Sequence, residues 1–289
     1  MYQCLERAHQ RLPHVISTTF DDEDVTCDIV CFDFGAALLS LLQDDELMVA
    51  GNVVTNPDNP TSMYFPVDEK VGEANSGQRY RDLYNKLITP GKNGIFVPII
   101  LDLDGTIIDS KGHIEICPVS YTTSLFTEKV RRDSGAWRIL SYVPDLNRER
   151  LSAMDLFDNS RSSAGKGRTT HNFHRVMDAV MKGMVHAQAG KNDKLKKVPL
   201  KLGGKWIVVD IVCPLLFIIN DGQQGDQLCG RMSGHHSSII RHHRSCNCVY
   251  DDLDNPHVDC TFLDVESINN ACRHGSDEDL QELTMYRVD

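Results

Sequence analysis

The sequence predicts an α/β protein, and three observations carry this prediction. The stretch 96–121 contains two strand-length apolar runs separated by a turn signal, which indicates a β-hairpin. A long helix is expected at 170–189, because apolar residues recur there at helical spacing until Gly190. The most apolar stretch of the chain, 206–220, is divided by Pro214, which favours two consecutive buried strands over one helix.

The expected hairpin places two carboxylates on one face of its first strand. The apolar run Phe96–Leu101 is rich in β-branched residues and is followed by Asp102 and Asp104. Side chains alternate between the faces of a strand, so these two point the same way. Oxygen ligands on a rigid strand are what a hard cation such as Mg²⁺ requires. The alternative that the pattern leaves open is an exposed acidic strand end.

The remaining elements are weaker predictions. Residues 1–92 are expected to form an acidic, mainly helical lead-in, with amphipathic helices at Phe32–Met48 and Gly77–Leu87. The block Arg131–Pro144 combines a basic pair with a third strand at 137–143. A polar linker and a basic connector are expected before and after the long helix, at 145–167 and 191–205.

The second apolar strand of 206–220 is followed directly by Asp221, so it too delivers a carboxylate at its end. Beyond it, residues 229–260 are dense in cysteine and histidine, a composition that suits tetrahedral Zn²⁺. The expected zinc ligands are Cys246, Cys248, Cys260 and His243, with His242 and Cys229 in reserve. The spacing is irregular, because Cys246 and Cys248 are separated by one residue, and a basic, histidine-rich loop stays open as the alternative.

Composition sets further limits. No apolar run approaches the roughly 20 residues of a membrane span, and no secretory signal is recognised, so an intracellular protein is expected. Its ten cysteines are expected to be reduced thiols, some of them on zinc, rather than a disulfide framework.

Charge is distributed very unevenly along the chain, whose net charge is −11. Residues 161–205 hold 11 basic and 2 acidic residues, a net charge of +9, whereas 1–60 and 251–289 each have a net charge of −9. A basic centre between acidic ends is typical of a phosphate-binding surface, although a solvated lysine-rich face would have the same composition. The candidate nucleic-acid contacts are Arg131, Arg132, Lys196, Lys197, Arg241 and Arg244.

Several of these motifs, in this order, carry a resemblance to a known family. They are Leu103–Thr106, the Pro118-Val119 strand, the Arg131–Pro144 block with its Trp137, the run from Leu215 through Asp221 to Arg231, and the Cys/His loop. Over roughly residues 30–289 the chain resembles transposases of the Plavaka and Kyakuja–Dileera–Zisupton group of DNA transposons. The Arg131–Pro144 block is the most specific part of the resemblance.

The resemblance implies a ribonuclease-H-like mixed sheet with a DDE-type acidic triad and two Mg²⁺ ions. Asp104 and Asp221 match its first two acids, with Asp102 in reserve, and the Cys/His loop matches an insertion thought to bind zinc. The domains would be the lead-in at 1–92, a partial core at 93–228, and the insertion with an acidic tail at 229–289. The third acid is expected beyond residue 289, so the chain is expected to be a truncated, inactive remnant.

The same resemblance implies DNA as partner and the nucleus as location, with a homo-oligomer left open. Such a remnant would retain DNA binding through its basic centre, and a non-catalytic DNA-binding remnant is one alternative reading. Strands are expected near 97–104, 112–121 and 137–143 in one antiparallel sheet, then the helix at 171–189 and a parallel strand at 215–220.

A rival interpretation is a haloacid-dehalogenase-like phosphatase, because Asp102–Thr106 (DLDGT) after an apolar strand is also that superfamily's signature. Asp102 would then be the nucleophile and Asp104 the general acid–base, with Asp221 and Asp226 on Mg²⁺. Ser141 and either Lys201 or Lys205 would complete the site. This fold would have a parallel sheet with alternating helices, which separates it from the first interpretation.

Overall fold

The computed structural model describes residues 13–20, 25–55, 59, 61–62, 72–88, 93–107, 115–143, 163–202, 204–220, 225, 228 and 265–276. The chain forms two compact units, one of residues 1–144 and 178–219 and the other of residues 145–177 and 220–289. No helix within the described ranges is long and apolar enough to cross a membrane.

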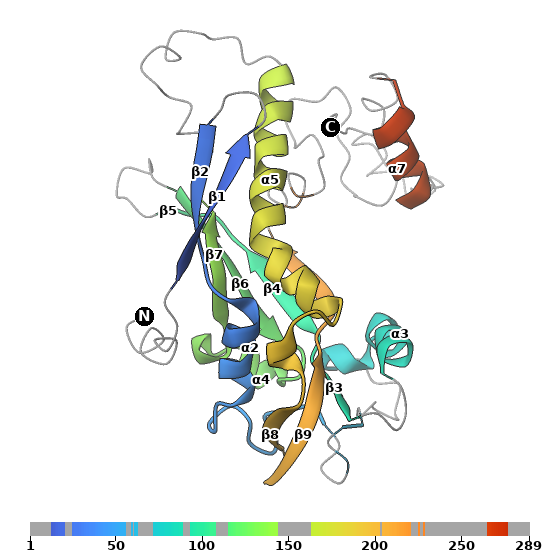
Figure 1. Ribbon diagram of the computed structural model, residues 1–289. Helices are drawn as coiled ribbons and strands as arrows, with labels where there is room; N and C mark the ends of the chain where they lie inside the picture. Colours follow the sequence, from blue (N-terminus) through green and yellow to red (C-terminus); the bar gives the residue numbers. More distant parts are fainter. Residues whose placement is uncertain are drawn as a thin grey trace. The chain divides into compact units, whose positions relative to one another are not determined.

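The first unit is built on a mixed sheet (Figure 1). Six strands follow one another in the order β1-β2-β7-β6-β4-β10, and the two-residue β5 (Thr106–Ile107) pairs with β6 beside this path. The strands are β1 (His14–Phe20), β2 (Val25–Cys31), β4 (Ile99–Leu103), β6 (Glu115–Thr123), β7 (Arg138–Val143) and β10 (Leu215–Asn220). The pairs β1–β2, β2–β7, β7–β6 and β6–β4 are all antiparallel.

β10 runs parallel to β4, and this direction is set by the three-stranded sheet that precedes the two strands. In that sheet, β3 (Gly94–Phe96) pairs in parallel with β9 (Lys205–Val212), and β8 (Val198–Leu202) pairs antiparallel with the other edge of β9. The two paired chains then continue together, because Val97 N donates to Val212 O and Ile99 N to Pro214 O, each at 2.8 Å. Both bonds step forward along both chains, so β4 and β10 leave this point in the same direction.

Helices pack on this sheet through aromatic contacts. α2 (Phe34–Leu42) begins at Asp33, whose carboxylate accepts from Ala36 N at 2.7 Å as an N-cap. Its Phe34 ring lies 5.2 Å from that of Tyr121 on β6. α5 (Ser163–Gln188) passes close to α2 at Gly183, where a Cβ would lie 3.5 Å from Cβ of Phe34.

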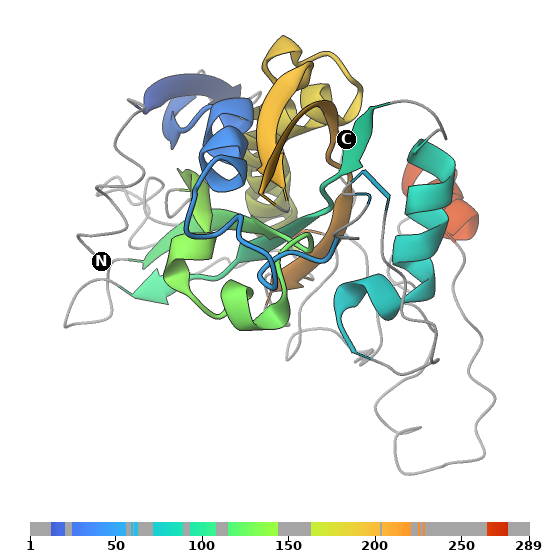
Figure 2. The same cartoon turned by 90° about the horizontal axis from the view of Figure 1, so that it is seen from below.

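At the β3 end of this unit, α3 (Gln78–Leu87) lies beside the strands (Figure 2). It packs on an apolar cluster there. Tyr80 is fully buried against Phe96 and Leu216, and its ring meets Phe96 edge-on at 5.2 Å. Such edge-to-face pairs stabilise a core beyond the area that they bury. The short α4 (Glu128–Arg131) and the 3₁₀ turns η1 (Ala74–Ser76), η2 (Ser134–Ala136) and η4 (Asp193–Leu195) complete the unit.

The second unit contains the first half of α5, where Phe173, Val176 and Met177 are buried, and α7 (Val265–His274). His174 on α5 shares a 3.1 Å hydrogen bond between its Nε2 and the carbonyl of Leu228.

The elements expected for the core are confirmed at their places. Strands lie at 99–103, 115–123, 138–143 and 215–220, and the long helix covers the expected 171–189 as far as Gln188. The first three strands form one antiparallel arrangement, as expected. The helices expected at Phe32–Met48 and Gly77–Leu87 are present as α2 and α3.

The lead-in is not mainly helical, because its residues 14–31 form the β1–β2 hairpin, which extends the sheet beyond β7. Alternation is visible in β2, where Cys27, Ile29 and Cys31 are buried and the residues between them are exposed. The acidic segment 21–24 makes this region polar on average, so the strand-like runs on either side of it were not recognised in the sequence.

The expected basic connector at 191–205 also contains a strand. In β8, Val198, Leu200 and Leu202 point inward while Pro199 and Lys201 are exposed. The strands at 206–220 are present but are not buried throughout, since they carry several exposed apolar side chains: Trp206, Val208, Phe217, Ile218 and Ile219. Their unbroken apolar run suggested burial on both faces, whereas β9 covers the core with one face only.

Candidate functional site

The predicted carboxylates lie on β4 as the alternation requires. Leu101 and Leu103 are buried on one face, and between them Asp102 is half-buried on the other, with Asp104 exposed just after the strand. On the neighbouring strand Ser120 is the direct partner of Asp102, and its hydroxyl donates to Oδ2 of Asp102 at 3.4 Å. The strand therefore presents two carboxylates and one hydroxyl on the same face.

The electrostatics of Asp102 are those of a carboxylate held near another carboxylate. Burial raises the pKa of Asp102, and the charge of Asp104 raises it further, while the hydrogen bond from Ser120 partly opposes both effects. A bound cation would relieve the repulsion between the two carboxylates. Oxygen donors of this kind fit a hard divalent cation, although Asp102 and Asp104 alone are fewer than such an ion requires.

The strand order places β10 next to β4, on the side away from β6. The two strands run in the same direction, so their carboxyl ends lie at the same edge of the sheet. β10 ends at Asn220. Asp221, the second predicted acid, follows Asn220 directly in the sequence and lies outside the described residues.

The predicted zinc ligands are not described by the structure. Cys229, His242, His243, Cys246, Cys248 and Cys260 all fall outside the described ranges, as do Arg241 and Arg244. Within the described part of the chain, no three His, Cys, Asp or Glu side chains converge as a metal site.

Arg131, a candidate DNA contact, has a clear role inside the protein. Its guanidinium donates to the carbonyl of Phe126 and pairs with Glu73 at 3.1 Å, and its side chain is only 15% exposed. The indole of Trp137 donates to the carbonyl of Arg131 at 2.7 Å, which ties the residues of this basic block together. Arg131 and Trp137 are therefore accounted for by contacts within the protein. By contrast, Arg132 is 77% exposed and contacts Glu128 one turn away.

Arg138, in the same block, is also structural. It is buried, and its guanidinium donates to the hydroxyl of Ser40 on α2 at 2.8 Å and to the carbonyls of Gly135 and Trp137. It therefore ties α2 to the start of β7, the strand within the block.

The other two candidates that the structure describes lie between η4 and β8. Lys196 is exposed and pairs with Asp193 at 2.8 Å. Lys197 is exposed and adopts a left-handed conformation with φ of 51°, in which its amide donates to the carboxylate of Asp210 at 2.8 Å. The Lys197 side chain is therefore presented to solvent by a turn that Asp210 holds in place.

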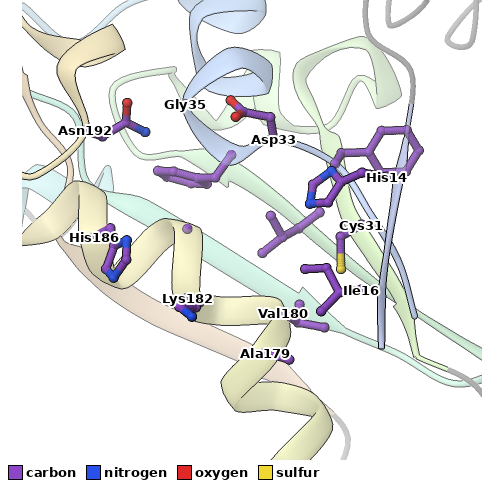
Figure 3. Close-up of a pocket in the computed structure, with 14 residues that line it drawn as sticks. His14, Ile16, Cys31, Asp33, Gly35, Ala179, Val180, Lys182, His186 and Asn192 are labelled. Atoms are coloured by element: carbon purple, nitrogen blue, oxygen red, sulfur yellow. The ribbon is translucent and has the colours of Figure 1, made fainter. Parts of the chain in front are cut away.

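A cavity that the sequence did not indicate lies between β1, β2, the start of α2 and the later part of α5 (Figure 3). Its volume is about 250 Å³, and its polar lining includes His14, Asp33, Lys182, His186 and Asn192. Asp33 is already engaged as the α2 cap and in an ion pair with Lys194 at 2.8 Å. The helical spacing of Lys182 and His186 was the only sequence signal, and it is common on solvated helices.

No protein-family model matches this chain, and no curated protein matches it.

Proposed function

We propose that this chain is a transposase-related DNA-binding protein with a ribonuclease-H-like core and a Mg²⁺-binding carboxylate site at Asp104 and Asp221. One observation carries the proposal, which is the order and direction of the strands around β4. β7, β6 and β4 are consecutive antiparallel neighbours, and β10, reached through α5, β8 and β9, lies in parallel on the other side of β4. The order and direction of these four strands are those expected of such a core, whose first acid belongs to its first strand, while the β8–β9 hairpin is an addition to it.

The phosphatase alternative receives less support from the same sheet. A doubly wound fold would flank β4 with parallel strands, whereas β6 is antiparallel to it along five residue pairs. Ser141, the hydroxyl that a phosphatase would need in its site, is fully buried on β7 and donates to the carbonyl of Val30 at 2.9 Å. That hydroxyl therefore links β7 to β2.

The metal part of the proposal rests on the donor set. Asp102 and Asp104 share a face of β4, and Asp221 follows the strand that runs beside it. When bound, Mg²⁺ would supply the Lewis-acid activation that DNA strand cleavage needs. The protein's own part is to hold the oxygens: Asp104 follows directly after β4, and Ser120 donates to Asp102 on the strand. Two or three carboxylates give only part of a two-metal site, so cleavage by this chain alone is not expected.

The DNA part of the proposal rests on charge. Residues 161–205 have a net charge of +9, and Arg132, Lys197 and Lys201 are among the exposed cations of the first unit. Lysine and arginine on such a surface contact phosphates rather than base edges, so binding is expected to depend little on sequence. The proposal places the protein in the nucleus, where its DNA would be.

The test is a gel-shift salt series on duplex DNA, paired with a nicking assay in Mg²⁺ or Mn²⁺. Binding is expected at low salt and should weaken steeply as salt rises, because condensed counterions are released on binding. No nicking is expected. Asp104→Ala and Asp221→Ala are the matched variants, and both should bind DNA like the unmodified protein.

Two results would count against the proposal. Absence of binding at low salt, or binding that salt does not weaken, would remove the DNA part. Nicking that both alanine variants abolish would show that the chain holds a complete catalytic site, against the expected lack of cleavage.

A further inference from the structure

The hairpin formed by β8 and β9 has an outward face that nothing in the described part of the protein covers. Trp206 on this face is 70% exposed and Val208 is 55% exposed. Cross-strand pairing puts Lys201 directly opposite Trp206, and Pro199 opposite Val208. The other face of the same hairpin carries the buried side chains Leu200, Leu202, Val209 and Ile211. The outward face is therefore an aromatic and aliphatic stripe with a lysine beside its tryptophan.

The hairpin lies in a lysine-rich segment. Between Asp193 and Asp210 the sequence holds five lysines. Asp210 is itself exposed on the outward face, two residues after Val208, and its carboxylate accepts from Lys197 N at 2.8 Å. Lys205 is exposed near the tip of the hairpin, but it pairs with Leu202, so alternation directs it away from the face of Trp206. Lys201 pairs with Asp45 at 3.8 Å, and the two side chains are 50% and 83% exposed. An ion pair so exposed contributes little and leaves Lys201 available to a stronger anion.

We propose that the outward face of the β8–β9 hairpin binds single-stranded DNA, with an unpaired base stacked on Trp206 and an adjoining phosphate held by Lys201. An exposed tryptophan loses apolar hydration when it is covered, and its flat ring accepts any base. Lys201 beside it, in a segment with five lysines, matches the anionic backbone of DNA. In a duplex the base faces are already stacked, so Trp206 would favour unpaired bases.

The inference rests on the proposed function for its choice of DNA, but it does not use the carboxylates of β4. Its test is therefore run without added Mg²⁺ or Mn²⁺ and without a chelator, so that a carboxylate-bound metal plays no part and any zinc stays in place. Fluorescently labelled oligo(dT) is titrated with the full chain, and affinity is measured by anisotropy. Stacking on an aromatic side chain contributes about 1–3 kcal/mol per base, so Trp206→Ala should weaken binding roughly 5- to 150-fold. Trp206→Phe should retain most of the affinity.

Val185→Ala is the matched control, because Val185 is an exposed apolar residue on α5, outside the hairpin. It should leave oligo(dT) affinity unchanged. Duplex binding at the same salt should fall much less in Trp206→Ala than oligo(dT) binding does. Circular dichroism of each variant should match that of the unmodified protein, which keeps a loss of binding distinct from a loss of folding.

A second readout comes from the tryptophan itself. The chain has two tryptophans, Trp137 and Trp206, so Trp137→Phe leaves Trp206 as the sole indole fluorophore. Oligo(dT) should quench its emission as a base stacks on the ring. If Trp137→Phe misfolds through loss of the bond to Arg131, the quenching that Trp206→Phe removes gives the same information.

The outcomes separate the inference from the proposed function. Unchanged oligo(dT) affinity in Trp206→Ala, with duplex binding intact, would overturn the inference alone. No binding of either DNA form by the unmodified protein would overturn both. Emission that shifts to the blue with anionic phospholipid vesicles, and is not quenched by oligo(dT), would assign the face to a membrane surface and overturn the inference.

Discussion

Asp102 is held on β4 under conditions that disfavour its charge. It is half-buried between Leu101 and Leu103, it lies near the charge of Asp104, and the hydroxyl of Ser120 donates a hydrogen bond to it. A side chain kept in such a place is expected to have a use, since desolvated like charges are common at functional sites. The unfavourable free energy of keeping Asp102 charged can be tested without DNA or metal.

The first prediction is that Asp102→Asn stabilises the protein at neutral pH. Because folding raises the pKa of Asp102, the native state holds the proton more tightly than the unfolded state does. The stability that this gives is present below the ordinary pKa of 3.8 and is lost as pH rises through the raised value. The asparagine variant avoids that loss, and its amide oxygen can still accept from Ser120.

Urea denaturation between pH 3.5 and pH 8, without divalent metal, measures the effect. The unfolding free energy of the variant should exceed that of the unmodified protein at pH 7, and the excess should shrink below about pH 4. Asp178→Asn, on an exposed position of α5, controls for the loss of one negative charge. A variant less stable than the unmodified protein at pH 7 would show that the Asp102 carboxylate is favourable in the fold.

At the residue scale the sequence predicted the face of each carboxylate but not its neighbours. Alternation along β4 was enough to place Asp102 and Asp104 together. The position of Ser120 opposite Asp102 depends on the register between β4 and β6, which the intervening segment sets and which alternation alone does not determine.

At the scale of elements, prediction succeeded where the apolar pattern was continuous and failed where charged residues surround it. α5 repeats its apolar residues over many turns, and β4 and β10 lie in apolar runs. β1 precedes the acidic segment 21–24 and β8 lies among lysines, so the alternation within these two strands was not recognised. In the connection between β6 and β7 the sequence showed a basic pair, Arg131 and Arg132, but not the hydrogen bonds and ion pair that Arg131 makes within the protein.

The second prediction concerns that connection, in which Arg131 and Arg132 are neighbours with different surroundings. Arg131→Ala removes the donors to the Phe126 carbonyl and the partner of Glu73, whose other oxygen accepts from Glu128 N at 2.6 Å. The loss of such partly buried, charge-assisted bonds is expected to lower the unfolding free energy by about 1–3 kcal/mol. Arg132→Ala, which loses one exposed contact within α4, should change it by less than about 0.5 kcal/mol.

Chemical denaturation of the two variants checks the stability effect, and a gel shift on the folded proteins checks the DNA effect. Arg132→Ala should weaken DNA binding at constant stability, as expected for an exposed phosphate contact. If instead Arg131→Ala is as stable as the unmodified protein and binds DNA poorly, Arg131 faces DNA and its contacts to Glu73 and Phe126 matter little.

At the scale of the whole molecule, the cysteines fall into two groups, one within the first unit and one in the stretch after β10. The first unit contains the described cysteines Cys27, Cys31, Cys117 and Cys213, the first three of them on strands of its sheet. Cys27, Cys31 and Cys213 are buried there. The remaining candidate thiols, Cys229, Cys246, Cys248 and Cys260, belong to the stretch between β10 and α7. Two classes of cysteine with different chemistry are therefore expected in one chain.

The third prediction is that the protein holds about one zinc ion per chain, bound by Cys246, Cys248, Cys260 and one of His242 or His243. Zinc needs thiolates, and the chain supplies three such cysteines within 15 residues. Metal analysis of protein purified without chelators should find the ion, and Cys246→Ser should lose it. Cys213→Ala is the matched control, because burial raises the pKa of Cys213 to about 12 and keeps its thiol protonated, so zinc content should not change. Protein without zinc even after zinc is added back would exclude the site, as would full zinc content in Cys246→Ser combined with Cys229→Ser, since Cys229 is the reserve ligand.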